Sequence, residues 1–223
     1  MLVKHRMTRD PVSVEADATL GTALRLMREH RVRHLPVVEK GELVGMLSDR
    51  DLRLAMPSPL GMESAEDVAA VERTPVADVM ARGAITAGPY DTVEDAAVRM
   101  RRYRVGSLPV VDAEGCLLGI LTETDIIQAF VEIFTASGPS SRLEVSLPDR
   151  PGELSRAMRA IGEELNINVN SVMVTGRDGT GRKTAVVYLA TIDPREAIAA
   201  LERAGATVGW PSLENDVRRM GDA

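Results

Sequence analysis

Residues 34–51 read HLPVVEKGELVGMLSDRD, and residues 107–125 read SLPVVDAEGCLLGILTETD, which is the same pattern with one residue inserted. Working outward, residues 7–38 align without gaps on residues 80–111, with 12 identities in 32 positions. Six more identities follow in the 15 aligned positions after the insertion. The period of 73–74 residues is too long for a solenoid repeat. The first half of the chain is therefore a duplicated subdomain.

Each copy predicts the element order β-α-β-β-α. A short strand, at residues 12–14 or 85–87, precedes a helix whose apolar residues recur at helical spacing. The Leu-Pro-Val-Val strand and a turn follow, then a further strand at residues 43–47 or 117–121, after which a last helix begins. One such unit would expose an apolar sheet face, so we expect the two copies to pack together.

Composition places the chain among soluble globular proteins. Of its 223 residues, 44% are hydrophobic and 27% are charged, which excludes a largely disordered chain. No apolar run approaches the roughly 18 residues of a membrane span, and the start lacks the apolar stretch of a secretory signal. The single cysteine, Cys116, excludes an internal disulfide and a cysteine-built metal site. We therefore expect a cytoplasmic protein without membrane association.

Charge and aromatic content argue against nucleic acid as a partner. The formal net charge is −6, and the aromatic residues are one Trp, three Tyr and two Phe. These are too few and too scattered for a base-stacking platform. The basic residues are interleaved with acidic ones and form no run that would follow a phosphate backbone.

The concentrated polar signal in each copy is a hydroxyl three residues before an aspartate: Ser48 with Asp51, and Thr122 with Asp125. This spacing at the start of an apolar helix predicts a capping box, in which the hydroxyl accepts a backbone N–H. The same arrangement can bind a ligand, because helix starts bind anions and a carboxylate can accept both hydroxyls of a ribose. Both interpretations stay open, and one helix start can serve both.

A third segment begins after the small polar residues 135–141, which we interpret as a linker. The predicted elements are strands at 143–147, 167–174, 184–191 and 207–208, one helix opening at Pro151, and a second helix over 194–204. The order β-α-β-β-α-β is ferredoxin-like.

These patterns resemble two known families. The strand-helix-LPVV-GxLxGxLSxxD pattern, present twice in register over residues 1 to about 134, resembles a tandem pair of CBS domains, the regulatory module of the cystathionine-β-synthase type. The segment from about 141 to 209, with LPDRPGEL in its first turn and NINVNSV after it, resembles an ACT domain. The fold class implied is α+β, a CBS pair followed by a ferredoxin-like ACT domain, an arrangement similar to the bacterial acetoin-utilization protein family. The expected boundaries are residues 1–56 (CBS repeat 1), 57–74 (linker), 75–134 (CBS repeat 2), 135–141 (linker), 142–212 (ACT domain) and 213–223 (C-terminal tail).

The resemblance to CBS domains implies an adenine nucleotide or related adenosyl ligand, namely AMP, ADP, ATP or S-adenosylmethionine. It assigns the two aspartates of the capping boxes to the ribose and the two hydroxyls to the phosphate. Before Leu-Pro-Val-Val the first copy has Arg33-His34 and the second Gly106-Ser107, so we expect the first site to bind phosphate better. The candidate ligand residues are Val12, Arg33, His34, Met46, Ser48, Arg50, Asp51, Ile85, Ile120, Thr122 and Asp125, of which the four apolar ones are either core or adenine-wall residues.

The resemblance to ACT domains implies amino-acid binding at an interface between two copies. The candidate residues are Asp149, Arg150, Pro151 and Gly152 in the first turn and Asn168 on the next strand. Gly152 permits a close approach of backbone to ligand. The alternative, that the turn only connects and the asparagine only satisfies a strand end, stays open.

We therefore expect a non-catalytic regulatory sensor that forms a homodimer, acts on a target protein the sequence does not identify, and belongs in the context of acetoin utilization. No catalytic constellation, metal site or catalytic cofactor motif remains once the three modules are assigned. The alternatives are a nucleotide-acting enzyme, which would turn over nucleotide, and a purely structural interaction module, which would bind none.

Overall fold

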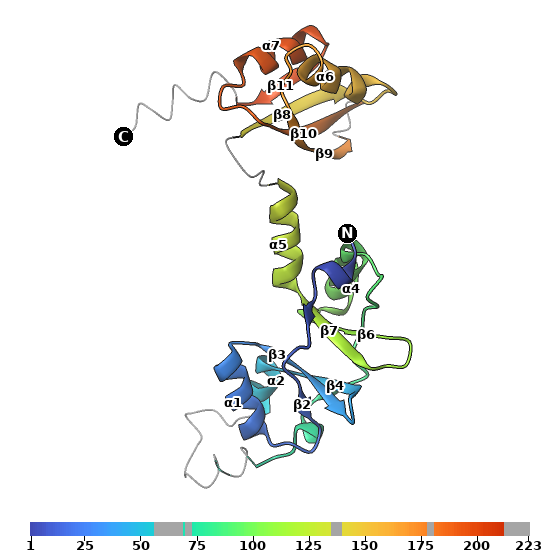
Figure 1. The fold of residues 1–223 in the computed structure, drawn as a ribbon, viewed down its shortest axis with the longest axis vertical. Coiled ribbons are helices and arrows are strands. Elements are labelled where there is room, and N and C mark those ends of the chain that lie inside the picture. The colour runs from blue at the N-terminus through green and yellow to red at the C-terminus, as the bar shows by residue number, and fades with distance from the viewer. Residues whose placement is uncertain (56–68, 70–72, 135–139, 178–180, 212–223) are drawn as a thin grey trace, which may run out of the picture. The chain divides into compact units, whose positions relative to one another are not determined.

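The computed structural model describes residues 1–55, 69, 73–134, 140–177 and 181–211. The chain divides into two compact units, Met1–Ala129 and Phe130–Ala223 (Figure 1). Most of the linker expected at 57–74 falls outside the described residues, as do most of the linker at 135–141 and the tail at 213–223.

The first unit contains both repeats, and each shows the predicted order. The elements are β2 (Val14–Glu15), α1 (Leu20–His30), β3 (His34–Glu39), β4 (Glu42–Ser48) and α2 (Asp49–Ala55), then α4 (Val93–Tyr103), β6 (Ser107–Val111), β7 (Leu117–Thr122) and α5 (Glu123–Phe134). The prediction for the short first strands was wrong in extent. Pairing starts only at Val14, and in the second repeat it is reduced to one bridge between Ala87 and Val110.

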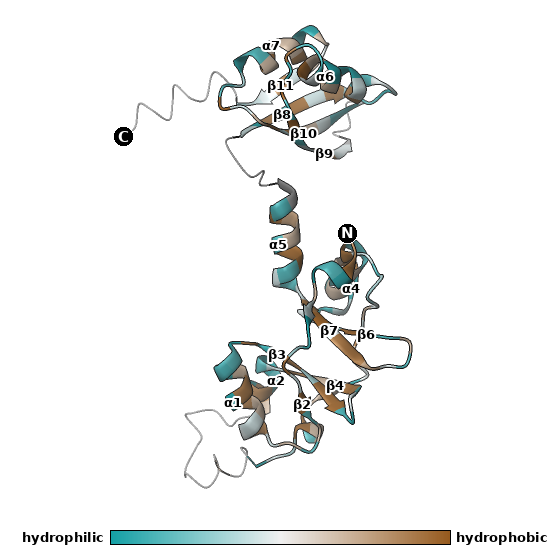
Figure 2. Cartoon of the chain, in the orientation of Figure 1, coloured by the Kyte–Doolittle hydropathy of each residue, from teal (hydrophilic) through white to brown (hydrophobic). Residues whose placement is uncertain are grey.

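The first helix of each repeat begins and ends in the same way. Thr19 accepts a hydrogen bond from the backbone N–H of Thr22 at 3.2 Å, and Thr92 does the same for Asp95 at 3.0 Å. Such caps satisfy N–H groups that lack a partner within the helix. Both helices end on a left-handed residue, and the apolar face of each is buried against the sheet of its repeat. In Figure 2 the strands β4 and β7 are mostly brown, the hydrophobic end of the scale.

Each sheet takes a strand from the N-terminal part of the other repeat. The strand orders are β2-β3-β4-β5 and β1-β7-β6, where β1 is Thr8–Arg9 and β5 is Ala81–Arg82. The short helices next to these strands follow them: Val3 of η1 (Val3–His5) is fully buried in the second core, and Val76 of η2 (Val76–Asp78) in the first. The first nine residues therefore pack with the second repeat.

The second unit consists of β8 (Ser141–Pro148), α6 (Glu153–Gly162), β9 (Val169–Arg177), β10 (Arg182–Leu189), α7 (Arg195–Arg203) and β11 (Thr207–Trp210). Its antiparallel sheet has the order β11-β8-β10-β9. The alternate residues Leu143, Val145 and Leu147 of β8 are buried with both helices. The predicted β-α-β-β-α-β order is confirmed, and the sheet leaves β9 as an edge strand.

The start of α6 differs from the prediction. Pro151 was expected at the first helical position, but Gly152 is the residue before the helix and has a φ of 89°, a left-handed conformation that glycine adopts readily. The helix therefore begins at Glu153, and Pro151 belongs to the turn. Among the described residues, no helix is both long and apolar enough to cross a bilayer.

Candidate functional site

The two capping boxes have the same geometry. Asp51 Oδ2 accepts hydrogen bonds from the backbone N–H of Ser48 at 2.8 Å and from its hydroxyl at 2.6 Å. In the second repeat Asp125 Oδ2 accepts the same two bonds from Thr122, both at 2.7 Å. Each hydroxyl in turn accepts the backbone N–H of its aspartate at 3.3 Å. These bonds use Oδ2 of each half-buried carboxylate, and within the described chain Oδ1 takes no part in them.

His34 lies near the starts of both α2 and α5. This residue opens β3 and lies opposite Ser48 in the β3–β4 pair, so it is next to the first capping box. Its Nε2 lies 3.3 Å from the position that a Cβ on Gly106 would occupy, and Glu123 Oε2 lies 3.6 Å from the same position. Gly106 precedes β6 and Glu123 begins α5, so the imidazole of the first repeat reaches the helix start of the second.

Burial lowers the pKa of His34, and the positive charge of Arg33 lowers it further. The carboxylates of Asp49, Glu123 and Asp51 oppose this and raise the pKa, but they do not outweigh burial. The neutral imidazole therefore dominates at neutral pH, where it can both donate and accept a hydrogen bond.

The remaining candidates of the first unit fall into two groups. Arg33 and Arg50 are exposed beside the first helix start. Val12 and Ile85 are partly buried and pack against the cores of the first and second repeats. Met46 and Ile120 instead belong to neither core cluster and occupy matching places, since Met46 pairs with Pro36 and Ile120 with Pro109.

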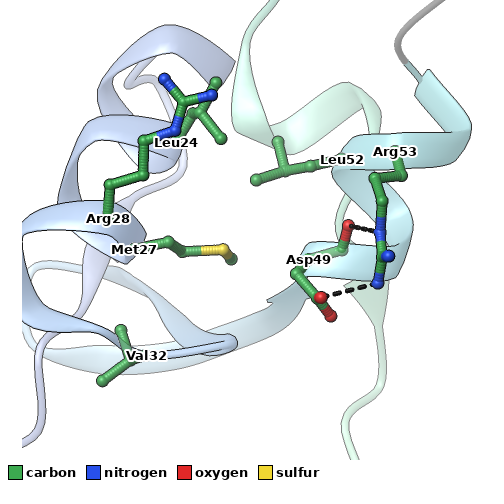
Figure 3. A pocket seen from close by; sticks show the side chains of 7 residues that line it. All are labelled: Leu24, Met27, Arg28, Val32, Asp49, Leu52 and Arg53. Carbon is green, nitrogen blue, oxygen red and sulfur yellow. Dashed lines mark hydrogen bonds and ion pairs between the residues drawn. The ribbon is translucent and has the colours of Figure 1, made fainter.

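A pocket of about 290 Å³ lies between α1 and α2 and includes Asp49, the first residue of α2, in its lining (Figure 3). Its lining residues are Leu24, Met27, Arg28, Val32, Asp49, Leu52 and Arg53. Arg53 is bonded to the Asp49 carboxylate at 2.7 Å across one turn of α2. Because none of the predicted ligand residues lines it, we place the candidate site at the two helix starts.

In the second unit the candidate residues do not come together within one chain. The backbone N–H of Asp149 donates to Gly181, and the Asp149 carboxylate pairs with Lys183 at 2.9 Å, which ties the turn to the start of β10. Asn168 precedes β9 and donates to Asn170 at 3.1 Å. The β8–β10–β9 register places this turn and Asn168 at opposite ends of the sheet, about 24 Å apart at roughly 3.4 Å per residue.

Sequence reasoning missed Glu123 and the part played by Gly106. Gly106 was interpreted as a site without charge, whereas in the structure its missing side chain leaves room for His34. The alignment of the copies held a signal, since the large Arg33 of one repeat stands where the other has glycine. Among the described residues, no cluster of His, Cys, Asp and Glu could hold a metal ion.

Comparison with known proteins defines the class. The family model for the CBS domain matches residues 3–58 and 76–132, and the chain therefore belongs to the CBS domain family, with two copies in tandem. A CBS domain-containing protein of Dictyostelium discoideum is 34% identical over 143 residues, which cover 63% of this chain and 99% of that protein.

Three solved structures are similar to the first part of this chain. The CBS pair of MJ0100, in complex with 5′-methylthioadenosine and S-adenosyl-L-methionine, is 27% identical with a TM-score of 0.51 and covers 59% of this chain and 97% of its own. CBSX2 in complex with AMP is 30% identical with a TM-score of 0.51. The match covers 60% of this chain and 98% of the CBSX2 chain. A putative acetoin utilization protein from Vibrio cholerae is 29% identical with a TM-score of 0.51. The match covers 60% of this chain and 93% of that protein's chain.

Proposed function

We propose that the chain is a non-catalytic regulatory sensor whose CBS pair binds AMP, ADP, ATP or S-adenosylmethionine. The observation that carries this proposal is the pair of equivalent capping boxes, each with an aspartate and a hydroxyl at a helix start. Solved CBS pairs of similar sequence contain AMP in one case and two adenosyl compounds in another, which supports the ligand class.

Each residue of the site has a chemical role in this proposal. The Oδ1 atoms of Asp51 and Asp125 accept ribose hydroxyls, which requires no rearrangement of the cap bonds on Oδ2. Arg33 and His34 supply the donors for a phosphate. Arg50 lies on the same helix start and adds exposed positive charge.

A thermal-shift panel tests the proposal directly. The purified chain is heated with AMP, ADP, ATP, S-adenosylmethionine and each amino acid in turn. A compound present at 100 times its dissociation constant stabilises the fold by about 2.7 kcal/mol, which is readily detected. A shift with an adenosyl compound supports the sensor. Turnover of nucleotide would favour the enzyme alternative, and the absence of any shift would favour a purely structural module.

For the second unit we propose an ACT domain that binds an amino acid between two copies of the chain. Its edge strand β9 presents Val172, Met173 and Val174 partly exposed, and an edge strand offers unpaired backbone groups to another strand. A second copy that pairs antiparallel with β9 would build one continuous sheet with twofold symmetry.

This pairing gives a reason for the separation of the turn and Asn168. Antiparallel pairing of β9 with the same strand of a second copy reverses one copy end for end. Asn168 of one copy then lies at the same end of the joined sheet as the Asp149–Gly152 turn of the other. A homodimer would thus complete two equivalent amino-acid sites that neither chain forms alone. The likeness to a putative acetoin utilization protein supports the proposed context of acetoin utilization.

A further inference from the structure

We propose that His34 couples the binding of a phosphate-bearing ligand to the uptake of a proton, so that ligand and proton each favour the other. This inference rests on the adenosyl ligand proposed above. It adds a form of regulation to that site, namely a response to pH that depends on one side chain at the junction of the two repeats.

The geometry places His34 between groups of both repeats. Its ring lies against the backbone of Gly106, where any side chain would be within 3.4 Å of Nε2 or Cε1. Glu123 Oε2 lies 3.6 Å from the same point, so the imidazole and this carboxylate are within about 7 Å, a distance over which charges interact. Through the β3–β4 pair His34 is also next to Ser48 and its capping box.

Without ligand, charged groups of both signs face His34. The neighbouring Arg33 disfavours protonation of His34, whereas Asp49 and Asp51 of α2 and Glu123 of α5 favour it. Gly106, which precedes β6 and lies against the ring, is uncharged. Two of these carboxylates are already engaged, Asp49 with Arg53 and Asp51 with Ser48. Burial has the largest effect: it lowers the pKa of His34 and leaves the imidazole neutral at neutral pH.

A bound phosphate changes this balance. A phosphate monoester brings a charge of about −1.5 to −2 at neutral pH, with oxygens that accept but do not donate hydrogen bonds. Next to His34 it favours the imidazolium, which donates from both nitrogens. Because binding linkage is reciprocal, a ligand that raises the proton affinity of His34 is itself bound more tightly when His34 is protonated.

Calorimetry with a matched pair of ligands tests the inference. AMP and 5′-methylthioadenosine share the adenosine moiety, and only AMP carries a phosphate. Titration of each into the full chain, in buffers of different ionisation enthalpy, gives the number of protons taken up on binding. We expect AMP binding to take up protons between pH 6 and 7.5 and to tighten at lower pH by at most about tenfold per pH unit. We expect 5′-methylthioadenosine to do neither.

Histidine variants assign the effect to one side chain. His34→Asn should still bind AMP but lose the proton uptake. Any change in protonation that remains would come from the phosphate group of AMP. The exposed His30, on the last turn of α1, provides the control, and His30→Asn should behave as the unmodified chain.

The outcomes separate this inference from the proposed function. AMP binding with no proton uptake, or with an uptake that His34→Asn retains, would overturn the inference and leave the adenosyl sensor standing. A failure of AMP, ADP, ATP, S-adenosylmethionine and 5′-methylthioadenosine alike to bind would overturn both.

Discussion

Gly119 lies directly against Met7: a Cβ added to this glycine would be 2.8 Å from the Met7 sulfur and 2.8 Å from the carbonyl oxygen of Thr8. The matching Gly45 stands in the same relation to Met80 and Ala81, at 2.7 and 2.9 Å. These glycines are the second Gly of each GxLxG sequence. They let the exchanged strands β1 and β5 approach β7 and β4.

We predict that Gly119→Ala lowers the free energy of unfolding by about 1–3 kcal/mol, because the backbone oxygen of Thr8 cannot move as a flexible side chain can. Gly45→Ala should act in the same way. Thermal unfolding followed by circular dichroism measures the change. Gly162→Ala is the control, since a Cβ there meets nothing within 4 Å. Equal stability of Gly119→Ala and the control would contradict the proposed role of the glycine.

The two capping boxes give a second prediction, on site assignment. In calorimetric titration with AMP, Asp51→Ala and Arg33→Ala should each weaken binding about tenfold or more, the effect of losing one charge-assisted hydrogen bond. Asp125→Ala should have the smaller effect, because the basic pair precedes the first Leu-Pro-Val-Val strand. Asp17→Ala, an exposed aspartate of the first repeat, serves as the control. If only Asp125→Ala abolishes binding, the phosphate site belongs to the second repeat.

The lowered pKa of His34 predicts how stability depends on pH without ligand. As pH falls below the ordinary value of 6.5, the unfolded chain binds a proton that the folded chain does not, so the folded state loses stability. The loss stops once the pH is below the pKa in the folded state. We expect His34→Asn to show a flatter decline of Tm between pH 7.5 and 5 than the unmodified chain. Parallel Tm curves for the variant and the unmodified chain would mean that burial does not oppose protonation of His34.

If β9 pairs with the same strand of a second copy, a charge on β9 should separate the second units of the two copies. Met173→Lys places a charge on the partly exposed edge strand, where a second strand would cover it. We expect light scattering at micromolar concentration to show a loss of association relative to the unmodified chain. Ile192→Lys is the control, because Ile192 is 78% exposed but lies outside the strands. A monomeric unmodified chain would rule out the homodimer itself.

A surface pair in the second unit offers a check by NMR. The Arg195 side chain and backbone N–H both donate to the Asp193 carboxylate, which lowers the pKa of Asp193 to about 2. In Arg195→Ala the side-chain bonds are lost, and the pKa of Asp193 should rise toward its ordinary value of 3.8. An unchanged titration of the Asp193 carboxyl would show that the pair does not persist in solution.

Local patterns explain why much of this architecture could be predicted. The apolar spacing around Leu20 and Met27 predicts α1, and the Ser48–Asp51 spacing predicts the capping box, because both depend on residues within one turn of a helix. The partner of Val3 could not be predicted in this way. A two-residue strand and one turn of helix carry no periodicity, and their burial depends on the second repeat, about ninety residues away.

In the candidate site, too, features set by local sequence could be predicted, whereas contacts between distant segments could not. The sequence indicates which residue types stand at each helix start. The contact between His34 and Gly106 depends on how the two repeats dock, which no spacing within one repeat encodes. The turn at Asp149 and Asn168 were grouped through the resemblance to ACT domains. Only the sheet register shows that these two features lie at opposite ends of one chain.

The reciprocal strands β1 and β5 also bear on the origin of the chain. An ancestral polypeptide with a single repeat would have carried a strand that its own sheet does not use, and would have lacked one at the edge of that sheet. A second molecule could supply it, with each molecule giving the same segment to the other in a swapped dimer. Gene duplication would then have joined two chains that were already partners. Such a history allows repeats to be gained or lost in pairs and selects against an odd one.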